Sequence, residues 1–108
     1  MKTSNHFFAW TLTIASLVTI GSCSPENVTT STLYTPTSAD VTSTATLQQL
    51  QQGRELYINN CGTCHHLYTP ETYSTAQWQN IVAQMAPKTR MVSAEVDLVL
   101  KYVTKGQS

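Results

Sequence analysis

The amino-acid sequence predicts an all-α domain of three to four helices that follows a long polar N-terminal segment. Apolar side chains recur at helical spacing in three stretches, residues 47–59, 75–86 and 94–103. A serine with a glutamine three residues later opens the middle stretch at Ser74, and Pro87 closes it. The 108 residues include 11% charged side chains and carry a formal net charge of +0, which leaves room for one small domain.

The first 22 residues are expected to be a secretory signal peptide. Lys2 precedes an apolar run over residues 7–20, which is too short to span a bilayer comfortably. The run ends in Ile20-Gly21-Ser22-Cys23, which resembles the lipobox of bacterial lipoproteins. This resemblance implies an exported protein that is held on the periplasmic side of a bacterial membrane, inner or outer, by lipid on Cys23. The alternative is an ordinary signal peptide that is cut near Gly21 or Ser22 and leaves Cys23 as a free thiol.

Residues 23–46 predict a disordered tether between the lipid and the domain. About half of residues 24–46 are Ser or Thr, and bulky apolar side chains are almost absent. Such a composition buries too little surface to offset the entropy cost of ordering the chain. We therefore expect the folded domain to begin at Leu47 and to extend over residues 47–108.

The segment Cys61-Gly62-Thr63-Cys64-His65 carries the most specific signal in the chain. Two thiols separated by two residues and followed at once by a histidine are typical of covalent attachment of one c-type haem. Cys61 and Cys64 share one face of a helical turn, where each can form a thioether with a haem vinyl group. The adjacent His65 can bind the iron axially. The alternatives are a redox dithiol, which requires a βαβ pattern, and half of a zinc site, which requires further ligands.

A second set of apolar residues is expected to pack against the haem. Four residues follow the i, i+3, i+4, i+7 spacing of a helix stripe: Trp78, Ile81, Val82 and Met85. Because His66 directly follows His65, it cannot reach the opposite face of the iron. The thioethers of Met85 and Met91 therefore remain as candidates for the second axial ligand. We favour Met85, which lies at the helix end, and Met91 is the alternative.

Two further expectations concern the connecting segments. Residues 66–73 show no clear period and predict a loop around one haem edge. A backbone carbonyl somewhere in this loop is expected to accept a hydrogen bond from the second ring nitrogen of His65, and Thr69 and Pro70 are the candidates. Ser93 is expected to cap the last helix.

Residues 53–103 resemble the class I cytochrome c family. In that family a helix with a glycine and, four residues later, an aromatic side chain crosses a C-terminal helix that bears its own aromatic. Gly53 and Tyr57 match the first helix, and Tyr102 would meet Gly53 at the crossing. The order of haem motif, Trp-x-x-Ile-Val-x-x-Met and final helix resembles very small bacterial members, which implies Met85 as ligand. Larger members, which carry the methionine on a loop, favour Met91.

The expected function is single-electron transfer rather than catalysis, because a His/Met iron has no open position for a substrate. Redox proteins would dock transiently at the exposed haem edge. The sequence has no Lys/Arg cluster that could grip phosphates, so we expect no nucleic-acid partner. Because the net charge is close to zero, we expect only weak long-range steering. The alternative is a haem with an open axial site, in a gas sensor or in an accessory subunit of a larger oxidoreductase.

Overall fold

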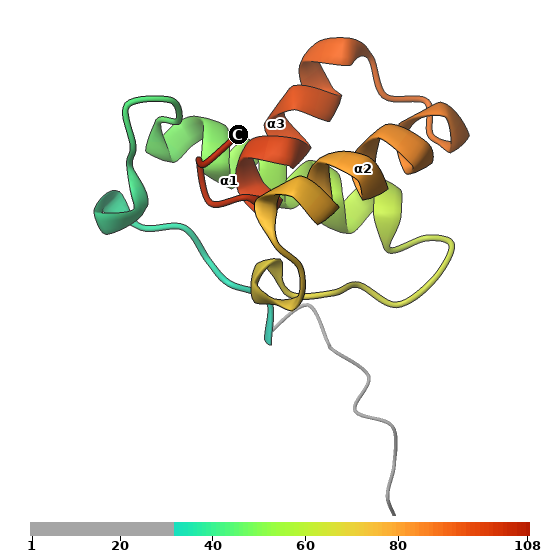
Figure 1. Ribbon diagram of the computed structural model, residues 1–108, viewed down its shortest axis with the longest axis horizontal. Coiled ribbons are helices and arrows are strands. Elements are labelled where there is room, and N and C mark those ends of the chain that lie inside the picture. Colours follow the sequence, from blue (N-terminus) through green and yellow to red (C-terminus); the bar gives the residue numbers. More distant parts are fainter. Residues whose placement is uncertain (1–31) are drawn as a thin grey trace, which may run out of the picture.

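The computed structural model describes residues 32–108 as a helical fold (Figure 1). Its body consists of α1 (Leu47–Leu56), α2 (Thr75–Met85) and α3 (Ser93–Val103). Four shorter helical segments connect or precede them: η2 (Ser38–Asp40), η3 (Tyr57–Cys61), η4 (Pro70–Thr72) and η5 (Ala86–Lys88). Residues 32–108 contain no strand, which confirms the predicted all-α class. No helix in this range is both long and apolar enough to span a membrane.

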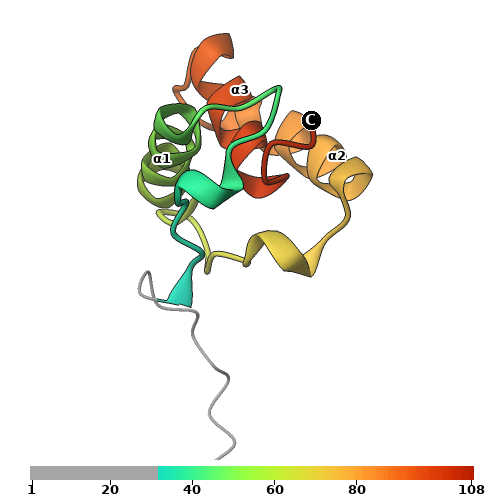
Figure 2. The same ribbon diagram turned by 90° about the vertical axis from the view of Figure 1, so that its left-hand side faces the viewer.

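The contact between α1 and α3 centres on Gly53. A Cβ atom placed on Gly53 would lie 2.0 Å from the carbonyl oxygen of Leu98 and 2.9 Å from Cβ of Tyr102. The two helices therefore approach so closely that only a glycine fits between them. Figures 1 and 2 both show α3 crossing α1. This is the crossing, with Tyr102 beside Gly53, that the family resemblance implied.

Polar side chains define where two of the helices begin. At the start of α2, Ser74 Oγ accepts from the backbone N–H of Gln77 at 3.3 Å, and Gln77 Oε1 accepts from the N–H of Ser74 at 2.9 Å. Thr46 and Gln49 form the same reciprocal pair at the start of α1. These bonds satisfy backbone donors that have no partner inside the helix.

The expectation that Ser93 caps the last helix is wrong. Ser93 is the first residue of α3, and Val92 occupies the capping position. Val92 has no side-chain acceptor, and its own backbone N–H donates to Glu95 Oε2 at 2.9 Å. The carboxylate of Glu95, in the first turn of α3, therefore satisfies the backbone donor of the capping residue.

The first helix also ends differently from its prediction. It was expected to continue as a regular helix to residue 59, but α1 stops at Leu56 and continues as the π-helical turn η3. Asn60 Nδ2 donates to the carbonyl oxygen of Leu56 at 2.9 Å. This side-chain bond competes with regular backbone bonding at the end of the helix. The wider turn carries the chain to Cys61, its last residue.

The structure departs from the predicted tether at residues 33–46. Leu33 and Ala45 are only 3% and 2% exposed. The ring of Tyr34 stacks on that of Tyr102, with centroids 5.8 Å apart. The carbonyl oxygen of Tyr34 accepts hydrogen bonds from Arg54 Nε at 3.1 Å and from Tyr102 Oη at 2.8 Å. We call residues 33–46 the strap, because they pack along the body instead of leading away from it (Figure 2).

The second half of the strap closes on the end of α3. The hydroxyl groups of Thr42 and Thr44 both donate to the carbonyl oxygen of Gly106, and Lys101 Nζ donates to the carbonyl oxygen of Thr44. Gly106 has φ 73°, and a Cβ there would lie 2.6 Å from Thr42 Oγ1. The polar residues that predicted disorder thus find hydrogen-bond partners far away in the sequence. The predicted signal peptide and Cys23 lie outside the described residues.

We expect Gly53→Ala to lower the free energy of unfolding of the haem-loaded protein by about 3 kcal/mol, because the added methyl group forces α1 and α3 apart. Urea unfolding followed by far-ultraviolet circular dichroism measures this change. Gln52→Ala, at an exposed neighbouring position of α1, is the control and should change the value by less than about 0.5 kcal/mol. Equal effects of the two substitutions would contradict the close packing at Gly53.

Tyr34→Ala tests whether the strap belongs to the folded body. We expect a loss of about 2 kcal/mol in the free energy of unfolding, since the stack on Tyr102 and its buried area are removed. The same urea titration measures it, with the exposed neighbour Thr35→Ala as control. A neutral Tyr34→Ala variant would restore the original prediction of a tether.

Candidate haem site

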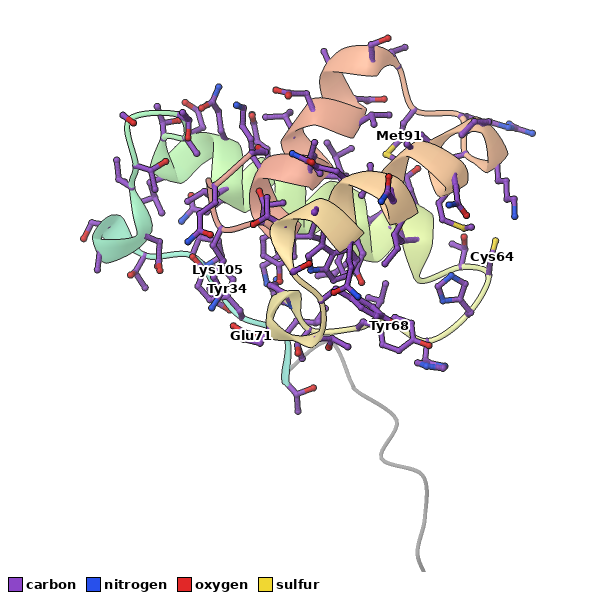
Figure 3. The ribbon with its side chains drawn as sticks, viewed as in Figure 1. Tyr34, Cys64, Tyr68, Glu71, Met91 and Lys105 are labelled. Atoms are coloured by element: carbon purple, nitrogen blue, oxygen red, sulfur yellow. The ribbon has the colours of Figure 1, made fainter. Side chains whose placement is uncertain are left out.

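The two cysteines and the histidine of the motif lie where the chain leaves α1. Cys61 ends the π-helical turn and is half-buried, whereas Cys64 and His65 follow on an exposed turn. Burial is the main cause of the raised pKa of the Cys61 thiol, and the neighbouring Cys64 contributes less. Figure 3 shows Cys64 on the loop that connects the end of α1 to the lower part of the molecule.

One cavity of about 420 Å³ brings the predicted site residues together. Its volume falls within the range of pockets that hold small molecules and cofactors. Eight predicted residues line it: Cys61, Cys64, His65, Trp78, Ile81, Val82, Met85 and Met91. The motif is thus placed opposite the stripe of α2 and the segment that precedes α3.

The ring of His65 is held by its own neighbour. Nδ1 of His65 lies 2.7 Å from the carbonyl oxygen of His66. With Nδ1 bonded to this carbonyl, Nε2 is the nitrogen that remains for a metal ion. The expected carbonyl therefore lies in the predicted loop, but it belongs to His66, and the candidates Thr69 and Pro70 are wrong. The carbonyl oxygen of Pro70 instead accepts a hydrogen bond from Trp78 Nε1 at 2.8 Å. This bond holds the indole ring of Trp78 in the wall of the cavity.

Tyr57 joins the loop to the end of α1. Its hydroxyl donates to the carbonyl oxygen of Tyr68 at 2.9 Å and accepts from the backbone N–H of Tyr68 at 3.1 Å. Burial raises the pKa of Tyr57 to about 12, so the phenol stays neutral and keeps both bonds. Tyr57, which matches the aromatic residue of the cytochrome c resemblance, therefore also holds the loop in place. The spacing of Gly53 and Tyr57 alone did not indicate this second role.

The cavity walls are mainly apolar. On α2, Trp78 is 2% exposed and Val82 is 8% exposed, while Ile81 and Met85 are half-buried. Further lining residues that the sequence analysis did not assign to the site are Tyr57, Asn60, His66, Tyr68, Tyr73, Ala86, Lys88, Thr89 and Val99. They come from the loops and from the short segments η3 and η5, apart from Val99 of α3, and their position depends on the rest of the fold. In Figure 3, Met91 lies between α2 and α3.

These residues fit a covalently held haem. The set comprises two thiols, an imidazole whose Nδ1 is hydrogen-bonded, and two thioethers that line the same apolar cavity. The two alternatives for the motif find less support in residues 32–108. No group of three or more His, Cys, Asp or Glu side chains gathers there for a metal ion, and this part of the chain has no strand for a βαβ unit.

Comparison with known families supports a protein that holds haem covalently. Residues 57–107, slightly less than half of the chain, match the family model described as dihaem cytochrome c. The matched part contains the whole motif and the cavity lining, and it supports a c-type cytochrome that binds haem covalently and takes part in electron transfer. The family is described as dihaem, whereas the sequence contains a single Cys-x-x-Cys-His motif. Neither a curated protein nor a solved structure matches the chain at a significant level.

We expect Cys61→Ala/Cys64→Ala to lose most of the helical signal in far-ultraviolet circular dichroism. A small domain with a large cavity in its core buries too little apolar surface to remain folded without the cofactor. Thr63→Ala, which keeps both thiols and His65, is the control and should retain the signal. Native helix content in the double variant would contradict a structural role of the haem.

Proposed function

We propose that this chain is a monohaem electron-transfer cytochrome whose iron is bound by His65 and Met85. The observation that carries the proposal is the shared cavity, in which the motif faces the apolar side of α2. Cys61 and Cys64 would hold the haem through thioethers, and Nε2 of His65 would bind the iron. The single motif in the sequence supports one haem in this chain, although the matched family is described as dihaem.

The preference for Met85 has support from packing. Met91 packs against the buried core cluster, which includes Val99 and Tyr102 of α3. Met85 does not belong to that cluster but lines the cavity at the last residue of α2. A flexible thioether that is free of core contacts can reach a metal ion with little loss of packing. The side chains of Trp78, Ile81 and Val82 then remain as the apolar wall against the ring.

The chemistry that haem supplies here is the gain and loss of one electron at iron. With two protein ligands, the iron would have no position for a substrate, so we propose no enzymatic activity. The residues of this chain would exclude water and set the potential: a thioether ligand and an apolar wall both favour the reduced, less charged form. Redox proteins would dock transiently at the open side of the cavity.

We also propose export and anchoring through lipid on Cys23. The support is the lipobox resemblance of residues 20–23. Attachment of several acyl chains stabilises membrane binding by about 0.8 kcal/mol per buried CH₂, so the domain would stay on the membrane surface. The domain would then lie on the periplasmic side of a bacterial membrane, inner or outer.

The axial ligand is tested by absorption spectroscopy of the oxidised protein. We expect Met85→Ala to lose the weak long-wavelength band of an iron–sulfur bond, while Met91→Ala, the matched control, keeps it. The covalent haem signature of the pyridine haemochrome, at one haem per chain, should persist in both variants. Loss of the band in Met91→Ala alone would assign the ligand to Met91 instead.

The alternative function, a haem with an open axial site, makes a different prediction for carbon monoxide. A site closed by methionine should bind carbon monoxide slowly or not at all in the ferrous wild type. Rapid binding at neutral pH would favour the gas sensor or accessory subunit.

A further inference from the structure

Two successive peptide groups after the haem motif connect the proposed iron ligand to the hydrophobic core. The carbonyl oxygen of the first group, between His66 and Leu67, lies 2.7 Å from Nδ1 of His65. The N–H of the second group, between Leu67 and Tyr68, donates to the hydroxyl of Tyr57 at 3.1 Å. A carbonyl oxygen can only accept, so the imidazole must carry a proton on Nδ1 to form the first bond. The orientation of the imidazole therefore depends on where the His66 carbonyl is held.

The bond between His65 and His66 does not fix its own position. It joins adjacent residues, and both of them are exposed. A bond between neighbours is local and moves with the turn that contains it. Exposed turns also open more readily than the core. The His66 carbonyl therefore needs support from residues that are anchored in the body of the protein.

Leu67 is the first anchor of this carbonyl. It is 6% exposed and belongs to the buried core cluster. Its side chain lies over Gly62 of the motif, since a Cβ placed on Gly62 would be 3.4 Å from Leu67 Cδ1. In the part of the chain that the structure describes, Leu67 is not among the residues that line the cavity. Its packing holds one side of the first peptide group without a contact to the haem site.

Tyr57 is the second anchor. It is only 5% exposed, and its ring meets that of Trp78 edge-on with centroids 6.1 Å apart. Its hydroxyl donates to the carbonyl oxygen of Tyr68 at 2.9 Å and accepts from the N–H of the same residue. Figure 3 shows Tyr68 on the loop that follows Cys64. Two bonds to the backbone of one residue fix its direction as well as its position.

We propose that Tyr57 is a positioning residue for the iron ligand: through the backbone of Tyr68, its hydroxyl holds the His66 carbonyl against Nδ1 of His65. The proposal rests on the haem function proposed above and adds a residue that regulates the reduction potential. An imidazole that donates from Nδ1 is a more basic ligand through Nε2, and a more basic ligand favours the oxidised iron. The clamp therefore lowers the potential, against the effect of the thioether and the apolar wall.

Tyr102 provides a matched control for Tyr57. Burial raises the pKa of both phenols to about 12, so both are neutral. The hydroxyl of Tyr102 also donates to a backbone carbonyl, that of Tyr34, at 2.8 Å. This bond belongs to the strap, and Tyr34 keeps its second bond, from Arg54 Nε, when the hydroxyl is removed. Phenylalanine at either position removes a bond from a buried hydroxyl to a carbonyl, but only the bond of Tyr57 leads to His65.

The reduction potential of the haem-loaded protein tests the proposal. We expect Tyr57→Phe to raise the equilibrium constant for one-electron reduction about threefold, which is about 28 mV at about 59 mV per tenfold change. Tyr102→Phe should change this constant less than about 1.5-fold, although both variants should unfold at lower urea concentrations than the wild type. Equal shifts of potential in the two variants, or no shift in Tyr57→Phe, would overturn the proposal.

Leu67→Ala loosens the same carbonyl from its other side. We expect it to raise the potential as Tyr57→Phe does, because it removes the buried anchor next to the carbonyl. Tyr57 itself lines the cavity, so its hydroxyl could also act on the haem directly. A raised potential in Tyr57→Phe with an unchanged potential in Leu67→Ala would assign the effect to that direct contact and overturn the positioning role.

Hydrogen exchange measured by NMR on the ferrous, haem-loaded protein follows the path between the two residues. We expect Tyr57→Phe to speed exchange of the Tyr68 amide and of the ring N–H of His65, each about tenfold or more. Tyr102→Phe should leave both rates unchanged. A faster Tyr68 amide with an unchanged His65 ring N–H would mean that the clamp ends at Tyr68, which overturns the proposal.

Two outcomes separate this proposal from its foundation. A wild type without the pyridine haemochrome signature of covalent haem would refute the proposed function, and the positioning role with it. A haem-loaded wild type whose potential and exchange rates do not depend on the hydroxyl of Tyr57 would refute the positioning role alone.

Discussion

The close approach of two backbones at Gly53 determines the rest of the architecture. Because the Leu98 carbonyl occupies the space of a missing side chain, α1 and α3 cross at contact distance. The crossing fixes the direction in which α1 delivers Tyr57 and then Cys61. A wider separation would move the haem motif away from α2, which supplies the opposite wall of the cavity. One absent side chain therefore sets the geometry of the site.

From this crossing, aromatic side chains extend in both directions and hold the loops. Tyr57 is in a tilted contact with Tyr102 at 5.8 Å and in an edge contact with Trp78 at 6.1 Å. Tyr102 in turn stacks on Tyr34 of the strap, and Trp78 contacts Tyr73 of the loop after the motif. Lys105 lies over the ring of Tyr34 and pairs with Glu71 (Figure 3). Rings thus connect segments that have few backbone bonds to one another, and each buried ring adds apolar area that a small domain needs.

The features that could be predicted from the sequence are those encoded locally. The motif is contiguous, the stripe of α2 follows the helical period, and the cap at Ser74 lies within four residues. The strap was missed because its stability depends on partners more than sixty residues away, such as Tyr102 and Gly106. The bond from His65 to the carbonyl oxygen of His66 depends on the path of the loop, which has no periodic signal.

The strap would also limit the distance between the domain and a membrane, if lipid on Cys23 holds the chain there as proposed. A free chain from Ser24 to Thr46 would reach roughly 75 Å when fully extended, at about 3.3 Å per residue. With the folded body beginning at Leu33, and with lipid on Cys23 as proposed, residues 24–32 offer a maximum of about 30 Å. Under that proposal, such a short connection would favour partners embedded in, or seated on, the same bilayer. Carriers that diffuse freely would have to approach the headgroups to exchange electrons with it.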